Sequence, residues 1–85
     1  MELKFNAVIL QNKDMDAAYI EVPYDIKAIF GKGRLPVHAT FDHEPYDGQV
    51  VKMGTPSYII GVTKAIRKKI GKSFGDEIAV TLRER

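Results

Sequence analysis

The 85-residue sequence contains no cysteine. This absence excludes disulfide bonds, thiolate chemistry and zinc sites built on thiolates. The fold must therefore be held together by packing and hydrogen bonds alone. For a chain this short, we expect a net stability on the order of a few kcal/mol.

Long hydrophobic runs are also missing. The N-terminus has no basic segment followed by an apolar stretch, and no run approaches the roughly 20 residues that cross a bilayer. We therefore expect a cytoplasmic protein that does not enter a membrane. No charge of one sign dominates either, because the formal net charge is only +2. This balance permits an acidic partner without requiring one.

The length and composition predict one small globular domain over residues 1–85. A second domain does not fit into 85 residues, and contents of 45% hydrophobic and 28% charged residues are ordinary for a folded protein. We expect order almost throughout and a monomer as the plausible state.

Alternating hydrophobic residues predict a β-rich fold. Leu3, Phe5, Ala7 and Ile9 alternate with more polar residues, although Val8 is less polar than the pattern requires. The same reasoning predicts six strands, at residues 3–9, 18–22, 35–41, 49–53, 57–62 and 78–82. Residues 12–16, 42–48 and 54–56 are rich in turn formers and predict the connections between strands.

Two short helices are expected between strands. Pro23 suits the first helical turn, Ile26, Ile29 and Phe30 fall on one face, and Gly31 ends the helix. Thr63 is the expected N-cap of the second helix, and Gly71 its stop. Its core-facing side chains are predicted to be Val62, Ala65, Ile66 and Ile70.

The two halves of the chain resemble each other. Val22, Ile26, Lys27, Gly31 and Lys32 recur forty positions later as Val62, Ile66, Arg67, Gly71 and Lys72. Neither half is expected to be stable alone, because short helices and single hairpins are marginal. We therefore predict a closed six-stranded barrel of two pseudo-symmetric ββαβ halves, at about residues 3–42 and 49–84.

Several segments resemble the bacterial domain of unknown function 1905 family. They are Arg34-Leu-Pro-Val-His-Ala-Thr-Phe-Asp42, Pro45-Tyr-Asp-Gly48, Val62-Thr-Lys-Ala-Ile-Arg-Lys-Lys-Ile-Gly71 and Gly75-Asp76. The resemblance covers residues 5–82 and implies a double-split β-barrel, the fold class that includes AbrB-like DNA-binding regulators. It implies no activity and no catalytic residues. In one respect the sequence departs from the family pattern, because His43 stands where a glycine usually follows the aspartate.

The second helix carries the best candidate binding surface. Its outer face is predicted to present Lys64, Arg67, Lys68, Lys69 and Lys72, with Lys32 and Arg34 added if the loops lie close together. The binding residues predicted from this pattern are Lys64, Arg67, Lys68, Lys72 and Arg34, with an acidic protein or a polyanion as partner. The alternative is that these lysines only solvate the helix and complement its dipole.

A second cluster combines nitrogen and oxygen ligands within ten residues. It consists of His38, Asp42, His43, Glu44 and Asp47. Along a strand, His38 and Asp42 share a face, whereas His43 points the other way. The spacing therefore favours a solvated strand end, and we expect no metal and no cofactor.

No catalytic constellation is evident in the sequence. Ser57 and Ser73 lack the strand-turn-helix context of an activated nucleophile, and no base is visible for either. Among the possible functions, we rank a binding domain first. Weak nucleic-acid binding through the second helix comes second, and a small-molecule-binding barrel or an enzyme comes third.

Overall fold

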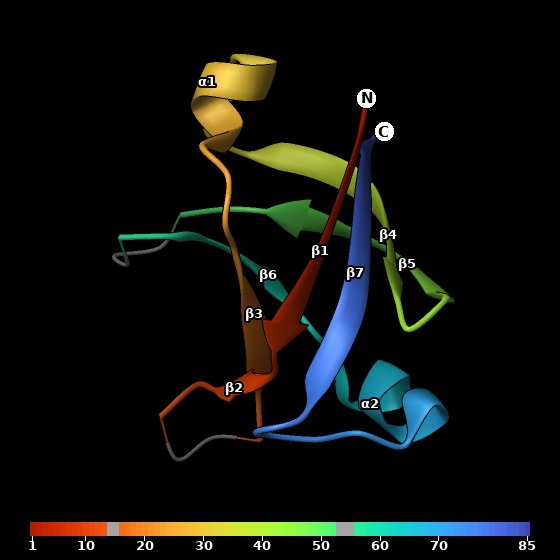
Figure 1. Ribbon diagram of the computed structural model, residues 1–85. Coiled ribbons are helices and arrows are strands. Elements are labelled where there is room, and N and C mark those ends of the chain that lie inside the picture. Colours follow the sequence, from red (N-terminus) through yellow and green to blue (C-terminus); the bar gives the residue numbers. More distant parts are fainter. Residues whose placement is uncertain (14–15, 53–55) are drawn as a thin grey trace.

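The order of elements repeats along the chain. The computed structural model describes residues 1–13, 16–52 and 56–85. Its elements are β1 (Glu2–Val8), β2 (Leu10–Gln11), β3 (Ala18–Val22), α1 (Ile26–Phe30), β4 (Leu35–Phe41), β5 (Glu44–Val50), β6 (Tyr58–Gly61), α2 (Lys64–Ile70) and β7 (Glu77–Glu84). Each half runs through strands, one short helix and a further strand, and the two helices lie at opposite ends of the molecule (Figure 1).

The strands form two antiparallel sheets, so the predicted closed six-stranded barrel is wrong. One sheet has the order β1-β7-β4-β5 and the other the order β2-β3-β6, which makes seven strands in the described part of the chain. At one junction, a single bridge joins Val51 to Ile59. At the other, β1 continues into β2, and pairing with β3 is limited to Leu10 and Gln11. Among the described residues, neither junction carries a continuous ladder.

A change of partner at Ile9 divides the first predicted strand in two. The Ile9 N–H donates to the Asp76 carbonyl at 2.9 Å, and its carbonyl accepts from Gly75 at 2.8 Å. The next residue, Leu10, pairs instead with Tyr19. Since the Ile9 side chain is fully buried, the chain crosses from one sheet to the other at a position fixed by the core.

Both helices are short and capped by the residues around them. The predicted Thr63 cap is confirmed, because its hydroxyl accepts from the Ile66 N–H at 3.2 Å. The predicted helix start at Pro23 is wrong, since Asp25 caps α1 and accepts from Ala28. Gly31 and Gly71 end the helices in the left-handed conformation, as expected. In the described residues, neither helix is long and apolar enough to cross a bilayer.

The core lies between the two sheets and is formed by inward-facing aliphatic side chains with one large aromatic, Phe41. Ile26 and Ile66, which are predicted to face the core from the helices, are buried, as are Val80 and Leu82 of the last strand. The helix faces are predicted less well. Ile29 and Ala65 are exposed, while Phe30 and Ile70 are half-buried. Helices of five and seven residues cover the ends of the core with fewer than two turns each, so their flanking positions remain in solvent.

The connection between β4 and β5 is a two-residue turn, so the turn predicted over residues 42–48 is wrong. Asp42 and His43 have φ of 49° and 73°, as a type I′ hairpin requires. Pro45 pairs with Thr40 next to the hairpin-closing pair. Its nitrogen therefore faces away from β4, where a missing N–H costs no ladder bond.

Some predicted connections lie partly outside the described residues. These are the turns at residues 12–16 and 54–56 and the end of the strand predicted at 49–53.

Candidate functional site

The basic residues of α2, and Lys72 just after it, lie close to carboxylates from other parts of the chain. Lys64 Nζ lies 3.2 Å from Asp16, Lys69 Nζ lies 3.7 Å from Glu44, and Lys72 Nζ lies 2.6 Å from Asp42. Each lysine is thus paired with an acid, although exposed pairs of this kind contribute little to stability. The α2 surface is therefore less positive than its lysine content indicates.

Arg67 is buried, and the prediction that it faces solvent is wrong. The residue is only 7% exposed. Its Nε donates to the Val62 carbonyl at 3.3 Å, and its two terminal nitrogens donate to the Asp16 carboxylate at 3.2 Å and the Asp16 carbonyl at 3.3 Å. The guanidinium also lies 5.0 Å from the Phe74 ring centre. Arg67 therefore links α2 to Asp16, just before β3, and this role is structural.

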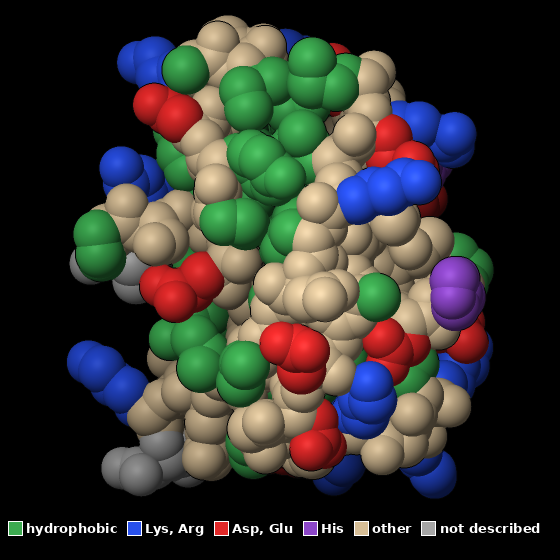
Figure 2. Space-filling view, viewed as in Figure 1, with side chains coloured by type: hydrophobic (Ala, Val, Ile, Leu, Met, Phe, Trp, Pro, Cys, Tyr) green, Lys and Arg blue, Asp and Glu red, His purple; other side chains and the backbone are tan. Residues whose placement is uncertain are grey.

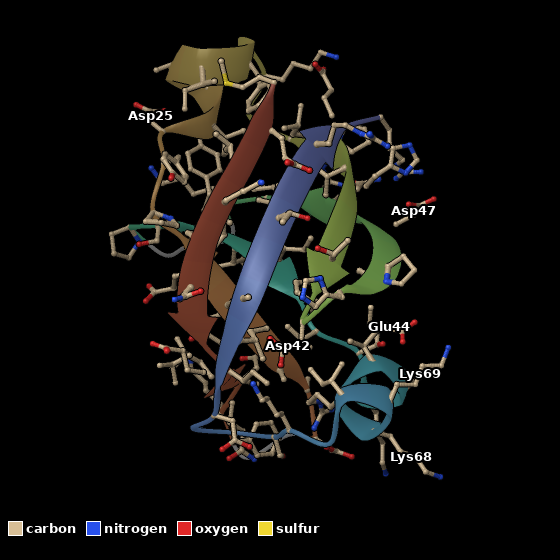
Figure 3. The ribbon with its side chains drawn as sticks, turned by 45° about the vertical axis from the view of Figure 1, so that its right-hand side comes forward. Asp25, Asp42, Glu44, Asp47, Lys68 and Lys69 are labelled. Carbon is tan, nitrogen blue, oxygen red and sulfur yellow. The ribbon has the colours of Figure 1, made fainter. Side chains whose placement is uncertain are left out.

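Lys68 and Arg34 lie apart from each other. Figure 3 shows Lys68 pointing away from α2 into solvent, and the described residues include no ion pair for it. Arg34 precedes β4 and donates to Gln49 at 3.1 Å, whereas Asp42 follows the same strand and pairs with Lys72. A seven-residue strand spans about 23 Å. The structure therefore does not bring Arg34 to the predicted α2 site.

The histidine and carboxylate cluster is dispersed among separate partners. His38 Nδ1 lies 2.6 Å from Asp47 across the β4–β5 ladder, while Asp42 and Glu44 pair with α2. Figure 3 shows Asp42, Glu44 and Asp47 at different places around the sheet. Among the described residues, no group of three or more His, Cys, Asp or Glu side chains is placed to hold a metal ion.

Asp42 fastens the β4–β5 turn to the neighbouring elements. Its carboxylate accepts from the Ala79 N–H at 2.8 Å and from Lys72, while its own N–H donates to the Ala79 carbonyl at 2.9 Å. Burial opposes ionisation of this carboxyl, but the hydrogen bonds from Lys72 and Ala79 outweigh burial and lower its pKa. Hydrogen bonds from Lys64 and Arg67 likewise lower the pKa of Asp16. Both carboxylates act as anchors for basic groups.

A groove opens where the two sheets part, between β1 and β3. We call it the β1–β3 seam. It has a volume of about 370 Å³ and is lined by Asn6, Ala7, Val8, Leu10, Glu21, Val22, Pro23 and Ser57. Figure 1 shows β1 and β3 close together beside β2 and diverging toward α1. The seam is therefore the place where the ladder between β2 and β3 stops.

The outer edge of β1 carries backbone groups that face the seam. Successive residues of a strand direct their N–H and C=O to opposite sides. Ile9 bonds toward β7, so Phe5 and Ala7 do the same, while Asn6 and Val8 face away from β7. The Lys4 carbonyl agrees with this pattern, because it accepts from the Tyr24 hydroxyl at 3.3 Å. Within residues 1–13, 16–52 and 56–85, β1 forms a ladder with β7 alone, so no ladder between β1 and β3 engages the backbone groups of Asn6 and Val8.

On the facing edge of β3, the backbone groups of Glu21 also point toward the seam. The Ala18 carbonyl accepts from Val62 on the β6 side, so Glu21, three residues further along, directs its backbone groups to the seam. Pro23 follows in the same orientation and has no N–H to donate. A ladder between β1 and β3 could therefore not include a hydrogen bond donated by residue 23, and the two strands diverge there.

The seam is not evident from the sequence, although two residues signal it. Val8 interrupts the alternation with an apolar side chain at an outward position, and it is 43% exposed. Pro23 marks the strand end with a residue unable to extend a ladder. Neither signal identifies a groove without knowledge of which strands are neighbours, and this pairing comes only from the fold.

Comparison with known proteins identifies one family. A family model described as "Domain of unknown function (DUF1905)" matches residues 5–82, nearly the whole chain. No curated protein matches the chain.

Proposed function

The chain belongs to the DUF1905 family of domains of unknown function, and on that premise we propose that it is a binding domain whose ligand occupies the β1–β3 seam. The observation that carries this proposal is the coincidence of an open groove with backbone groups that face it from both walls and that no ladder joins in the described residues. Backbone N–H and C=O groups are almost always paired in folded proteins unless water or a ligand reaches them. An open groove that displays such groups in a row is suited to recognition.

The seam also has a mainly apolar lining with a few polar groups. Its apolar residues are Ala7, Val8, Leu10, Val22 and Pro23. Figure 2 shows hydrophobic side chains gathered on this face below α1, over the region where β1 and β3 diverge. Apolar pockets with a small number of placed polar groups are typical of ligand sites.

Nucleic-acid binding through α2 is supported less well by the geometry. Asp16, Glu44 and Asp42 pair with the cations of this helix, and Arg67 is buried. Lys68 is the residue on α2 that presents its charge to solvent without a recorded pair. Few phosphate contacts give weak, salt-sensitive attraction. A cytoplasmic location and a monomeric state remain predictions of the sequence.

Site-specific photo-crosslinking in cells tests the proposal. A photoreactive phenylalanine analogue replaces either Val8, in the seam, or Lys68, on the exposed face of α2, which serves as the matched control. Both positions are exposed, so both variants are expected to fold. We expect discrete adducts from position 8 and not from position 68, with mass spectrometry identifying their chemical class.

The control position also decides between the two surfaces. Adducts to nucleic acid from position 68 alone would support the α2 alternative and contradict the seam. The absence of adducts from position 8, with folding confirmed by circular dichroism, would also contradict it.

A further inference from the structure

We propose that the β1–β3 seam binds an extended peptide segment, which adds to β1 as an antiparallel strand and places a Lys or Arg side chain beside Glu21. This inference rests on the proposed function and specifies its ligand. Strand addition uses backbone hydrogen bonds for affinity and side-chain pockets for specificity. The seam offers both.

The spacing of the β1 backbone groups that face the seam favours a peptide strand. Asn6 and Val8 are two residues apart on one strand, so their N–H and C=O groups repeat every 6.6 to 6.8 Å or so along β1. An antiparallel peptide strand presents its own groups at the same interval. Small rigid ligands do not reproduce this repeat, whereas any extended polypeptide does.

The seam lies along the edge of β1 that the fold leaves accessible, and this position favours the addition of a strand. β1 is paired with β7 on one side only, and edges of this kind readily accept another strand. Tyr24 closes one end, where its hydroxyl bonds the Lys4 carbonyl and its ring meets Phe5 edge-on at 5.9 Å. Pairing of β2 with β3 closes the other end. The open stretch between them is therefore short, and a segment of about five residues fills it.

The negative charge of Glu21 in the seam favours a peptide with a basic side chain. Glu21 is the charged side chain among the residues that line the seam. In the described part of the chain no basic group lies within ion-pairing distance of it. The carboxylate disfavours nucleic-acid phosphates and favours a cationic side chain. Next to it, Ala7, Leu10 and Val22 form an apolar floor, so the preferred peptide alternates apolar residues with polar ones, including Lys or Arg.

The experiment begins with a library of random heptapeptides displayed against the intact protein. The best peptide is then synthesised in three forms: unmodified, N-methylated at the amides that would pair with β1, and with its basic residue changed to glutamine. Isothermal titration or fluorescence anisotropy gives the affinities. N-methylation is expected to weaken binding by about 2- to 10-fold for each backbone hydrogen bond removed.

Protein variants test the same contacts from the other side. Asn6→Pro removes the outward N–H and leaves the β1–β7 ladder intact, because the ladder bonds come from Phe5 and Ala7. Asn6→Ala is the matched control, since it changes the side chain but keeps the N–H. We expect the proline variant to lose binding and the alanine variant to keep it. Glu21→Gln should weaken the unmodified peptide and leave the glutamine peptide unchanged.

Three results would overturn the inference. They are a library that yields no binding peptide, equal binding of the N-methylated peptide, and equal effects of Asn6→Pro and Asn6→Ala when both variants fold. Sedimentation at the same concentrations tests whether a second copy of the chain binds to β1 instead. Self-association through β1 in place of peptide binding would also contradict the inference. In each case, crosslinking of position 8 to another class of molecule would still support the proposed function, while the inference about the peptide would fail.

Discussion

Replacing Arg67 with alanine is expected to lower the free energy of unfolding by about 2 to 4 kcal/mol. The substitution removes hydrogen bonds to the Val62 carbonyl, the Asp16 carbonyl and the Asp16 carboxylate. It also removes the packing of a buried guanidinium against Phe74. Each hydrogen bond to a charged group is worth roughly 1.5 to 3 kcal/mol and the alkyl chain adds packing, but the exposure of Asp16 reduces the total. Denaturation by urea gives the value.

Two controls separate burial from charge. Lys68→Ala lies on the same helix and removes one positive charge from an exposed position, so we expect a change within about 0.5 kcal/mol. Arg67→Lys keeps the charge but not the planar set of donors, and an intermediate loss is expected. Equal effects of Arg67→Ala and Lys68→Ala would show that Arg67 faces solvent, contrary to the structure.

Replacing Asp42 with alanine is expected to lower the free energy of unfolding by a similar amount, about 2 to 4 kcal/mol. The carboxylate accepts hydrogen bonds from Ala79 and Lys72, and both are lost. In addition, residue 42 has a φ of 49°, and the left-handed region costs most residues about 1 to 2 kcal/mol. Asp42→Asn is the control, because asparagine tolerates this conformation and still accepts from Ala79.

The Asp42→Asn variant also isolates the contribution of the charge, which depends on pH. The pKa of Asp42 is lower in the folded protein than the ordinary value of 3.8 expected when it is unfolded. Its charged form therefore stabilises the fold fully above about pH 5, and this contribution is lost as the pH falls below 4 through the folded pKa. Lys72 and His43 are the charged or titratable groups beside it.

We expect the stability difference between wild type and Asp42→Asn to be constant near neutral pH and to shrink below about pH 4. Chemical denaturation at a series of pH values measures this difference, and other carboxylates cancel because both proteins contain them. A difference that does not change down to pH 2 would mean that the Asp42 charge contributes nothing.

The sequence predicted the local elements well where one physical signal dominates. The alternation in residues 35–41 predicts β4, and Thr63, Gly31 and Gly71 mark helix ends through capping and left-handed backbone. It failed where two signals compete. Asp42, Pro45 and Gly48 are turn formers, yet the hairpin uses only residues 42 and 43 and places Pro45 on the open side of an edge strand.

Arg67 and the seam needed tertiary information. By sequence, Arg67 belongs to a run of cations, and only its contact with Asp16, 51 residues away, explains why it is buried. His43 likewise has a φ of 73°, in the left-handed region that glycine adopts most readily, and only the two-residue hairpin explains this conformation. The predicted barrel failed for a non-local reason as well, because closure depends on whether β1 and β3 continue to pair beyond Leu10.

Amide hydrogen exchange along β1, followed by NMR, tests the open seam most directly. In the free protein, the amides of Phe5 and Ala7 are expected to exchange slowly because they bond to β7, and those of Asn6 and Val8 about tenfold or more faster. Addition of the selected peptide should slow Asn6 and Val8 and leave Phe5 and Ala7 unchanged. Equal protection of all four amides in the free protein would mean that β1 already pairs on both sides, and would contradict both the open edge and strand addition to it.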